Sequence, residues 1–324
     1  MKPTPTLVTV FGLVLCLAAM PKAQQPKNEL VIKPPYAPAP ELTAKPGVPK
    51  GTVHRFVMKS EDSKFYPGIS RDKPGVVVPY ERVVNVYVPA QYVTGTPAPF
   101  IVVQDGDSPR YKDPLPTVLD NLIAEKRVPA MIAVMVHPGG GAAVGERSLE
   151  YDTVSDRYTT FIETEVLPKI AKDYHITFTA DPQGRASMGG SSGAACAWTM
   201  AWFHPELYTR VLSYSGSFVN LENARNPEVS RGAWEYHQRL IPAAPAKPIR
   251  MWMHVSENDL GANREEASLQ NWVLANQHMA AALRLKGYSY RYTFSEGSGH
   301  VDAAVVNQTL PSALEWLWDG YPRR

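Results

Sequence analysis

The chain has 324 residues, of which 44% are hydrophobic and 20% charged, and its formal net charge is +2. This is the composition of an ordinary globular protein, long enough for one large domain or two small ones. A charge this close to zero, with no basic patch or charge run, argues against nucleic acid as a partner.

Residues 1–23 have the pattern of a secretory signal peptide. Lys2 lies in a short leading region, an apolar run covers about residues 7–20, and Ala23 could precede the cleavage point. The run is short for a membrane span. We therefore expect an exported protein, periplasmic or secreted, with no stable membrane span in the mature chain; an uncleaved N-terminal anchor is the alternative.

Residues 24–50 hold seven prolines, which predicts an extended, flexible, proline-rich linker with little fixed structure. The globular domain is then expected to cover residues 51–324. Of the 2 cysteines, Cys196 alone would remain after cleavage, so no disulfide within the mature chain is expected. Its apolar surroundings predict a packing role.

Beyond residue 80 the chain alternates candidate strands and helices. Strands are predicted over residues 82–88, 100–104, 131–136, 185–188, 210–214, 249–255 and 288–294, and helices over 115–126, 158–174, 194–203, 269–286 and 311–318. Repeated βα units of this kind predict an α/β fold with a mostly parallel central sheet and helices on both faces. In such sheets the functional site lies at the carboxyl ends of the strands.

Residues 189–193, Gly-Gly-Ser-Ser-Gly, fit the pattern G-x-S-x-G. In α/β-hydrolases this pattern is a sharp turn from a strand into a helix that exposes the hydroxyl of the central serine. A short strand before it and an apolar helix after it supply the context that the turn needs. The pattern therefore predicts Ser191 as a nucleophile, although a Gly/Ser-rich loop without chemistry has the same composition.

A serine hydrolase of this architecture carries its acid and its histidine later in the chain, in that order. Asp259 follows the strand predicted to end at residue 255, and His300 follows the next strand in a glycine-rich loop. His300 would take the proton of Ser191, and Asp259 would orient the imidazole. Glu257 leaves the same strand as Asp259 and is the alternative acid.

The oxyanion formed during acyl transfer needs two backbone N–H donors. One is expected from Ser192, directly after the nucleophile. The other is expected from Asp107, with Gly106 as second choice, because residues 104–107 follow an early central strand. The His-Pro-Gly-Gly-Gly run at 137–141 is a rival that Pro138 makes less suitable.

Cofactor chemistry has no support in the motifs. No P-loop lysine follows a glycine-rich loop, no dinucleotide fingerprint opens a helix, and the histidines lack metal-ligand spacing. We therefore expect neither a cofactor nor a metal. The expected partner is a small-molecule or carbohydrate ester; nothing in the sequence addresses the oligomeric state.

At these residues the chain resembles the putative esterase family of α/β-hydrolases, which includes enterochelin-type esterases, esterase D and feruloyl or acetyl xylan esterases. The resemblance covers about residues 80–321 and rests on the stretches at 102–106, 147–152, 184–193, 257–260, 299–300 and 313–318. It implies the same triad of Ser191, Asp259 and His300. Asp105-Gly106 departs from the family's commoner His-Gly. The stretch at 147–152 could order the wall of the site or be a structural salt-bridged turn.

These observations predict an exported serine carboxylic-ester hydrolase that forms an acyl-enzyme on an ester such as a siderophore lactone or an acylated carbohydrate or aryl ester. An acyltransferase with the same triad and a non-catalytic binding protein of the same fold are the alternatives. Specificity resides in loop contacts that the sequence does not define.

Overall fold

The computed structural model describes residues 28–68, 75–139, 146–221 and 229–323, so the predicted signal segment lies outside the described residues. The strands are β1 (Glu29–Ile32), β2 (Thr52–Lys59), β3 (Glu81–Val88), β4 (Phe100–Gln104), β5 (Ile132–Val136), β6 (Arg185–Gly190), β7 (Arg210–Tyr214), β8 (Arg250–Asn258) and β9 (Ser289–Gly299). The helices are α1 (Pro109–Lys112), α2 (Pro114–Ala124), α4 (Glu146–Tyr151), α5 (Arg157–Phe161), α6 (Leu167–Tyr174), α7 (Ser192–Phe203), α8 (Ile241–Ala243), α9 (Trp272–Leu285) and α10 (Ala303–Trp318).

These strands form one nine-stranded sheet in the order β1-β9-β8-β7-β6-β4-β5-β3-β2. The pairs from β1 through β5 are parallel, whereas β3 pairs antiparallel with both β5 and β2. The α/β fold with a mostly parallel sheet, predicted from the alternating βα pattern, is therefore confirmed. The parallel strands bring the ends of β4, β6, β7, β8 and β9 to one edge, where a site is expected.

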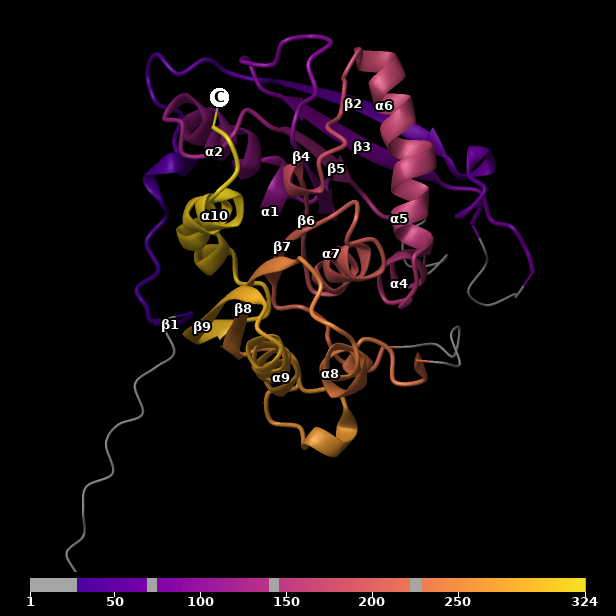
Figure 1. Ribbon diagram of the computed structural model, residues 1–324, viewed down its shortest axis with the longest axis vertical. Coiled ribbons are helices and arrows are strands. Elements are labelled where there is room, and N and C mark those ends of the chain that lie inside the picture. The colour runs from indigo at the N-terminus through magenta and orange to yellow at the C-terminus, as the bar shows by residue number, and fades with distance from the viewer. Residues whose placement is uncertain (1–27, 69–74, 140–145, 222–228, 324) are drawn as a thin grey trace, which may run out of the picture.

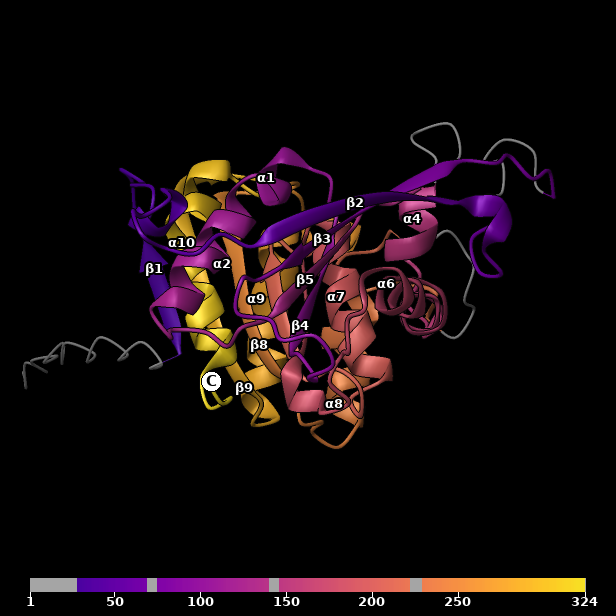
Figure 2. The same ribbon diagram turned by 90° about the horizontal axis from the view of Figure 1, so that it is seen from above.

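Helices cover both faces of the sheet (Figure 1). Helices α2 and α10 lie on one face, and α4 to α9 on the other, an arrangement that Figure 2 shows from the side of β2. Strand β4 is buried throughout and packs into both layers, with Val102 in the cluster on the α7 side and Val103 in the cluster on the α10 side. Burial on both faces explains why this strand is a continuous apolar run rather than an alternating one.

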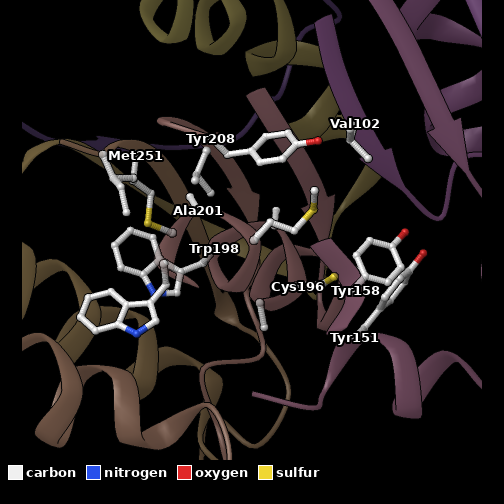
Figure 3. Close-up of a cluster of buried hydrophobic side chains, with 14 of the residues drawn as sticks. Val102, Tyr151, Tyr158, Cys196, Trp198, Ala201, Tyr208 and Met251 are labelled. Atoms are coloured by element: carbon white, nitrogen blue, oxygen red, sulfur yellow. The ribbon is translucent and has the colours of Figure 1, made fainter. Parts of the chain in front are cut away.

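Helix α7 is the centre of the larger core cluster, where buried aromatic and sulfur-containing side chains surround it (Figure 3). Its residues Ser192 to Trp202 are all buried, as its nearly continuous apolar sequence predicted. Cys196 is 1% exposed and lies near Tyr151 and Tyr158, and burial holds the pKa of its thiol well above the ordinary value. Cys196 is therefore a packing residue, not an accessible thiolate.

The N-terminal segment differs from the predicted flexible linker. From residue 28 onward it belongs to the domain, because β1 pairs with β9 over Glu29–Ile32. Further along, buried Asn121 of α2 donates hydrogen bonds to the carbonyls of Glu41 (2.8 Å) and Thr43 (2.9 Å). The prolines do favour an extended chain, but an extended chain can also add a strand to a sheet edge. The predicted domain start at Gly51 is thus too late.

Within the described ranges, no helix has both the length and the apolar character needed to cross a membrane.

Candidate active site

The turn between β6 and α7 has the geometry that its glycines predicted. Ser191 has φ 58° and ψ −128°, a conformation that costs a non-glycine residue free energy. β6 packs so closely on α7 at this turn that a Cβ added at Gly189 would lie 2.4 Å from the backbone carbon of Gly193. Ser191 donates its amide to Tyr214 O at 2.9 Å, which ties the turn to β7.

Asp259 and His300 meet at the ends of β8 and β9. His300 Nδ1 lies 2.5 Å from Asp259 Oδ1, and the Asp259 side chain is fully buried while that of His300 is 22% exposed. Burial alone would raise the pKa of Asp259, but hydrogen bonding and charge attraction from His300, with further hydrogen bonds, hold that pKa below its usual value. Asp259 is therefore an anion in direct contact with the imidazole of His300.

Glu257, the alternative acid, points elsewhere. Its carboxylate is exposed and accepts a hydrogen bond from the amide of Gly297 at 2.7 Å. This contact supports the loop that carries His300, but of the two carboxylates it is Asp259 that binds the imidazole.

Ser191 and His300 lie in adjoining loops. A side chain at Gly190 would come within 2.9 Å of Val301, and the amide of Val301 donates to Ser215 Oγ at 3.1 Å, so the histidine loop lies against the turn. The hydroxyl of Ser191 lies 3.2 Å from Ser217 Oγ. Within the described residues, no direct hydrogen bond joins Ser191 to His300. Catalytic hydrogen bonds are often long without substrate and shorten when it binds.

Two residues that the sequence did not single out complete this corner of the site. Ser217 contacts the Ser191 hydroxyl and accepts a hydrogen bond from Trp272 Nε1 at 3.0 Å. The Trp272 ring in turn stands edge-on to the His300 ring, with 6.2 Å between centroids. Since Ser217 and Trp272 come from different segments, only the fold brings them together.

The two amides predicted as oxyanion donors follow Ser191 and β4, respectively, and β4 is the neighbour of β6 in the sheet. The amide of Ser192 is the first of α7 and has no acceptor inside that helix, whose positive dipole end it forms. Asp107 lies in the turn after β4, where its carboxylate accepts a hydrogen bond from Asn85 Nδ2 at 3.0 Å. Gly106 donates its amide to Val136 O at 2.9 Å, so its N–H is already used and Asp107 is the better candidate.

The rival glycine run at 137–141 is described only up to Gly139. His137 donates its amide to Val83 O at 3.0 Å and continues the pairing with β3. Gly140 and Gly141 lie outside the described residues.

Asp105, at the end of β4, forms an ion pair with Arg147 of α4. Both carboxylate oxygens are used: Arg147 Nε donates to Oδ1 and Nη2 donates to Oδ2, each at 2.8 Å. The amide of Asp105 donates to Tyr151 Oη at 3.1 Å, and the Arg147 guanidinium lies over the ring of Tyr151. The stretch at 147–152 therefore contacts the loop that carries Asp107.

Two other histidines, His237 and His254, are buried. Burial lowers the pKa of His254 to about 4 and that of His237 to about 3, so both are neutral at pH 7. His254 contacts Ser295 Oγ at 2.7 Å, and His237 contacts the carbonyl of Phe218 at 3.1 Å. These contacts give both rings a structural role.

The fold and this arrangement of a strained serine turn with an acid–histidine pair define an α/β-hydrolase. The family model described as "Putative esterase" matches residues 77–317, more than half of the chain, and the chain belongs to this family. The resemblance to esterases is thereby confirmed, and ester hydrolysis is the activity that membership of this family supports.

One sequence relative and several solved structures are similar to this chain. The chain is 22% identical over 250 residues to the uncharacterized protein YbbA of Bacillus subtilis, covering 72% of this chain and 91% of YbbA. The enterobactin esterase FES from Shigella flexneri, with 2,3-dihydroxy-N-benzoyl-glycine present, has a TM-score of 0.59 at 19% identity and covers 87% of this chain. The match spans 62% of that esterase's own length.

A ferulic acid esterase has a TM-score of 0.59 at 19% identity, covering 84% of this chain and 99% of its own. A mutant of the feruloyl esterase module from Clostridium thermocellum, complexed with sinapinate, has a TM-score of 0.54 at 16% identity and covers 91% of this chain and 97% of its own.

Proposed function

We propose that this protein is an exported serine carboxylic-ester hydrolase. In this mechanism His300 removes the proton of the Ser191 hydroxyl, the alkoxide attacks the acyl carbon, and the amides of Ser192 and Asp107 stabilise the oxyanion. His300 then protonates the leaving alcohol, and water releases the acid from the acyl-enzyme. Asp259 holds the imidazole and stabilises its charged form.

The observation that carries the proposal is the Asp259–His300 hydrogen bond beside the strained turn of Ser191. A buried carboxylate that binds a part-exposed imidazole stabilises the fold no better than apolar side chains would, because removing the charge from water costs free energy. The loop of His300 also contacts Gly190 through Val301. A strained backbone and a buried charge, both at the carboxyl ends of neighbouring strands, are typical of a catalytic centre.

For the substrate we propose a siderophore lactone, or an acylated carbohydrate or aryl ester; the structural neighbours include an enterobactin esterase and a ferulic acid esterase. Export is proposed from the pattern of residues 1–23.

Hydrolysis of a short p-nitrophenyl ester tests the reaction. We expect Ser191→Ala to lower kcat by at least about 10³-fold, because the nucleophile is lost. Ser312→Ala, an exposed serine of α10 on the far side of the sheet, is the control and should retain the wild-type rate. A fluorophosphonate should label the wild type on the peptide that contains Ser191 and leave Ser191→Ala unlabelled.

Equal rates in the wild type and Ser191→Ala would overturn the proposal. A panel of ferulate, acetyl-sugar and catecholate siderophore esters then ranks the substrates by kcat/KM. Adding an alcohol acceptor to the same reactions and analysing the products distinguishes hydrolysis from acyl transfer.

A further inference from the structure

The Asp105–Arg147 ion pair lies next to both of the segments that carry the proposed oxyanion donors. Asp105 precedes Asp107 by two residues in the same turn. On the other side, Oδ2 of Asp105 is 3.2 Å from the position that a side chain on Gly193 would take, one residue beyond Ser192. The carboxylate therefore contacts the first turn of α7.

The backbone of Asp105 is constrained as firmly as its side chain. Its φ is 56°, in the left-handed region that non-glycine residues seldom adopt. Two contacts hold it: the hydrogen bond from its backbone amide to Tyr151 Oη, and the bidentate ion pair of its carboxylate with Arg147. Its side chain is 17% exposed and that of Arg147 is 40% exposed, so the pair is partly shielded from water.

A carboxylate at this place would destabilise the transition state of the proposed reaction. The proposed reaction builds a negative charge on an oxygen bound by the amides of Ser192 and Asp107, and a second negative charge nearby opposes it. A bidentate arginine cancels most of that field, since its guanidinium carries a permanent positive charge in a fixed fork geometry. Without the arginine, Asp105 would be an unpaired anion beside the oxyanion.

We propose that Arg147 is a positioning residue that holds Asp105 and balances its charge, so that the turn presents the amide of Asp107 to an oxyanion without electrostatic opposition. This rests on the proposed function, since it assumes the oxyanion. It also gives the stretch at 147–152 a role in the rate of the reaction, beyond that of a salt-bridged turn.

Four variants separate charge balance from mere scaffolding: Arg147→Met, Arg147→Lys, Asp105→Asn, and the double variant Asp105→Asn/Arg147→Met. We expect Arg147→Met to lower kcat roughly 10- to 100-fold, with KM little changed, because a charge opposing the transition state is uncovered. Arg147→Lys keeps a positive charge and should retain more of kcat. Asp105→Asn should cost less than Arg147→Met, although both break the same pair.

The double variant is the deciding test. If Arg147 acts by balancing the charge of Asp105, removing that charge as well should restore kcat at least about 5-fold relative to Arg147→Met alone. A double variant no faster than Arg147→Met would overturn the proposal, because the uncovered charge of Asp105 would then not be what lowers kcat. Should Arg147→Met fail to fold, Arg147→Gln serves in its place.

A second arginine–carboxylate pair, at the amino-terminal end of β6, provides the control. Arg185, at the start of β6, binds Glu163 at 2.5 Å and lies over the rings of Phe100 and Tyr208. Arg185→Met and Glu163→Gln should lower the melting temperature but leave kcat per folded molecule unchanged. Fluorophosphonate labelling counts the active molecules of each variant.

The failure of this proposal is distinguishable from failure of the proposed function. If wild type is active and Ser191→Ala is not, the hydrolase stands whatever the Arg147 series gives. If wild type and Ser191→Ala are equally active, there is no Ser191-derived oxyanion, and both proposals fall.

Discussion

At the scale of single residues, the two acids that leave β8 differ in what surrounds them. Asp259 accepts hydrogen bonds from the amide of Leu260 at 2.8 Å and from His300 at 2.5 Å, and its side chain is fully buried. Glu257 is exposed and binds the amide of Gly297. A difference of two residues along the chain therefore decides which carboxylate orients the imidazole.

Asp259→Asn should consequently be far more damaging than Glu257→Gln. The amide cannot stabilise an imidazolium and favours the wrong tautomer of His300, so we expect kcat to fall by roughly 10³-fold or more. Glu257→Gln keeps the shape of the side chain and can still accept from Gly297, so its kcat should stay within about 3-fold of wild type. Steady-state kinetics on one p-nitrophenyl ester compare the two variants. A larger loss of kcat in Glu257→Gln than in Asp259→Asn would make Glu257 the acid that orients His300.

The sequence predicts Ser191, Asp259 and His300 as the triad because each follows a strand in a recognisable local pattern. Ser217 and Trp272 carry no such pattern. Ser217 follows β7, and Trp272 begins α9, and they meet near Ser191 only because β6, β7 and β8 are adjacent in the sheet. Contacts between segments this far apart depend on strand order, which local composition does not encode.

At the scale of elements, strands buried on both faces were predictable from their apolar runs, whereas β2 was not. In β2 exposed positions such as Val53 and Val57 alternate with half-buried ones, so its sequence lacks the polar and apolar contrast of an ordinary edge strand. The helix predicted over residues 158–174 is real but interrupted, since residues Ile162–Val166 form a π-helical turn between α5 and α6. Such a turn leaves no mark in the hydrophobic spacing.

The contact between β6 and α7 requires Gly189 to have no side chain. An added Cβ would come within 2.4 Å of the backbone of Gly193, so Gly189→Ala must separate strand and helix, which we expect to cost roughly 1–3 kcal/mol of unfolding free energy. Because the separation moves Ser191, kcat should fall too. Urea unfolding and ester hydrolysis measure the two effects.

Gly95→Ala is the matched control for this substitution. Gly95 has φ 85°, but no atom lies within 4 Å of the position that a Cβ would take there. Alanine at this position therefore introduces only conformational strain of about 1 kcal/mol and should leave kcat unchanged. If Gly95→Ala lowered kcat as much as Gly189→Ala, the effect at the turn would be one of general stability.

At the scale of the whole molecule, the N-terminal segment (residues 28–50) adds the edge strand β1 beside β9 and then packs against α2. β1 covers β9, the strand that leads to His300, and Ala39 donates its amide to Asn307 O of α10 at 3.1 Å. Arg127 binds Glu41, which is 7% exposed. The partners of this segment lie up to 271 residues away along the chain, so its proline content could indicate an extended chain but not where that chain docks.

Removing residues 1–50 should therefore weaken the domain, whereas removing residues 1–27 leaves every one of these contacts in place. The longer deletion uncovers the edge of β9 and leaves the buried amide of Asn121 without its two carbonyl partners, which we expect to cost at least about 2 kcal/mol. Thermal unfolding of both proteins measures the difference. The loss should extend to kcat, since β9 carries the loop of His300. Equal melting temperatures would show that residues 28–50 are the dispensable linker that their prolines predicted.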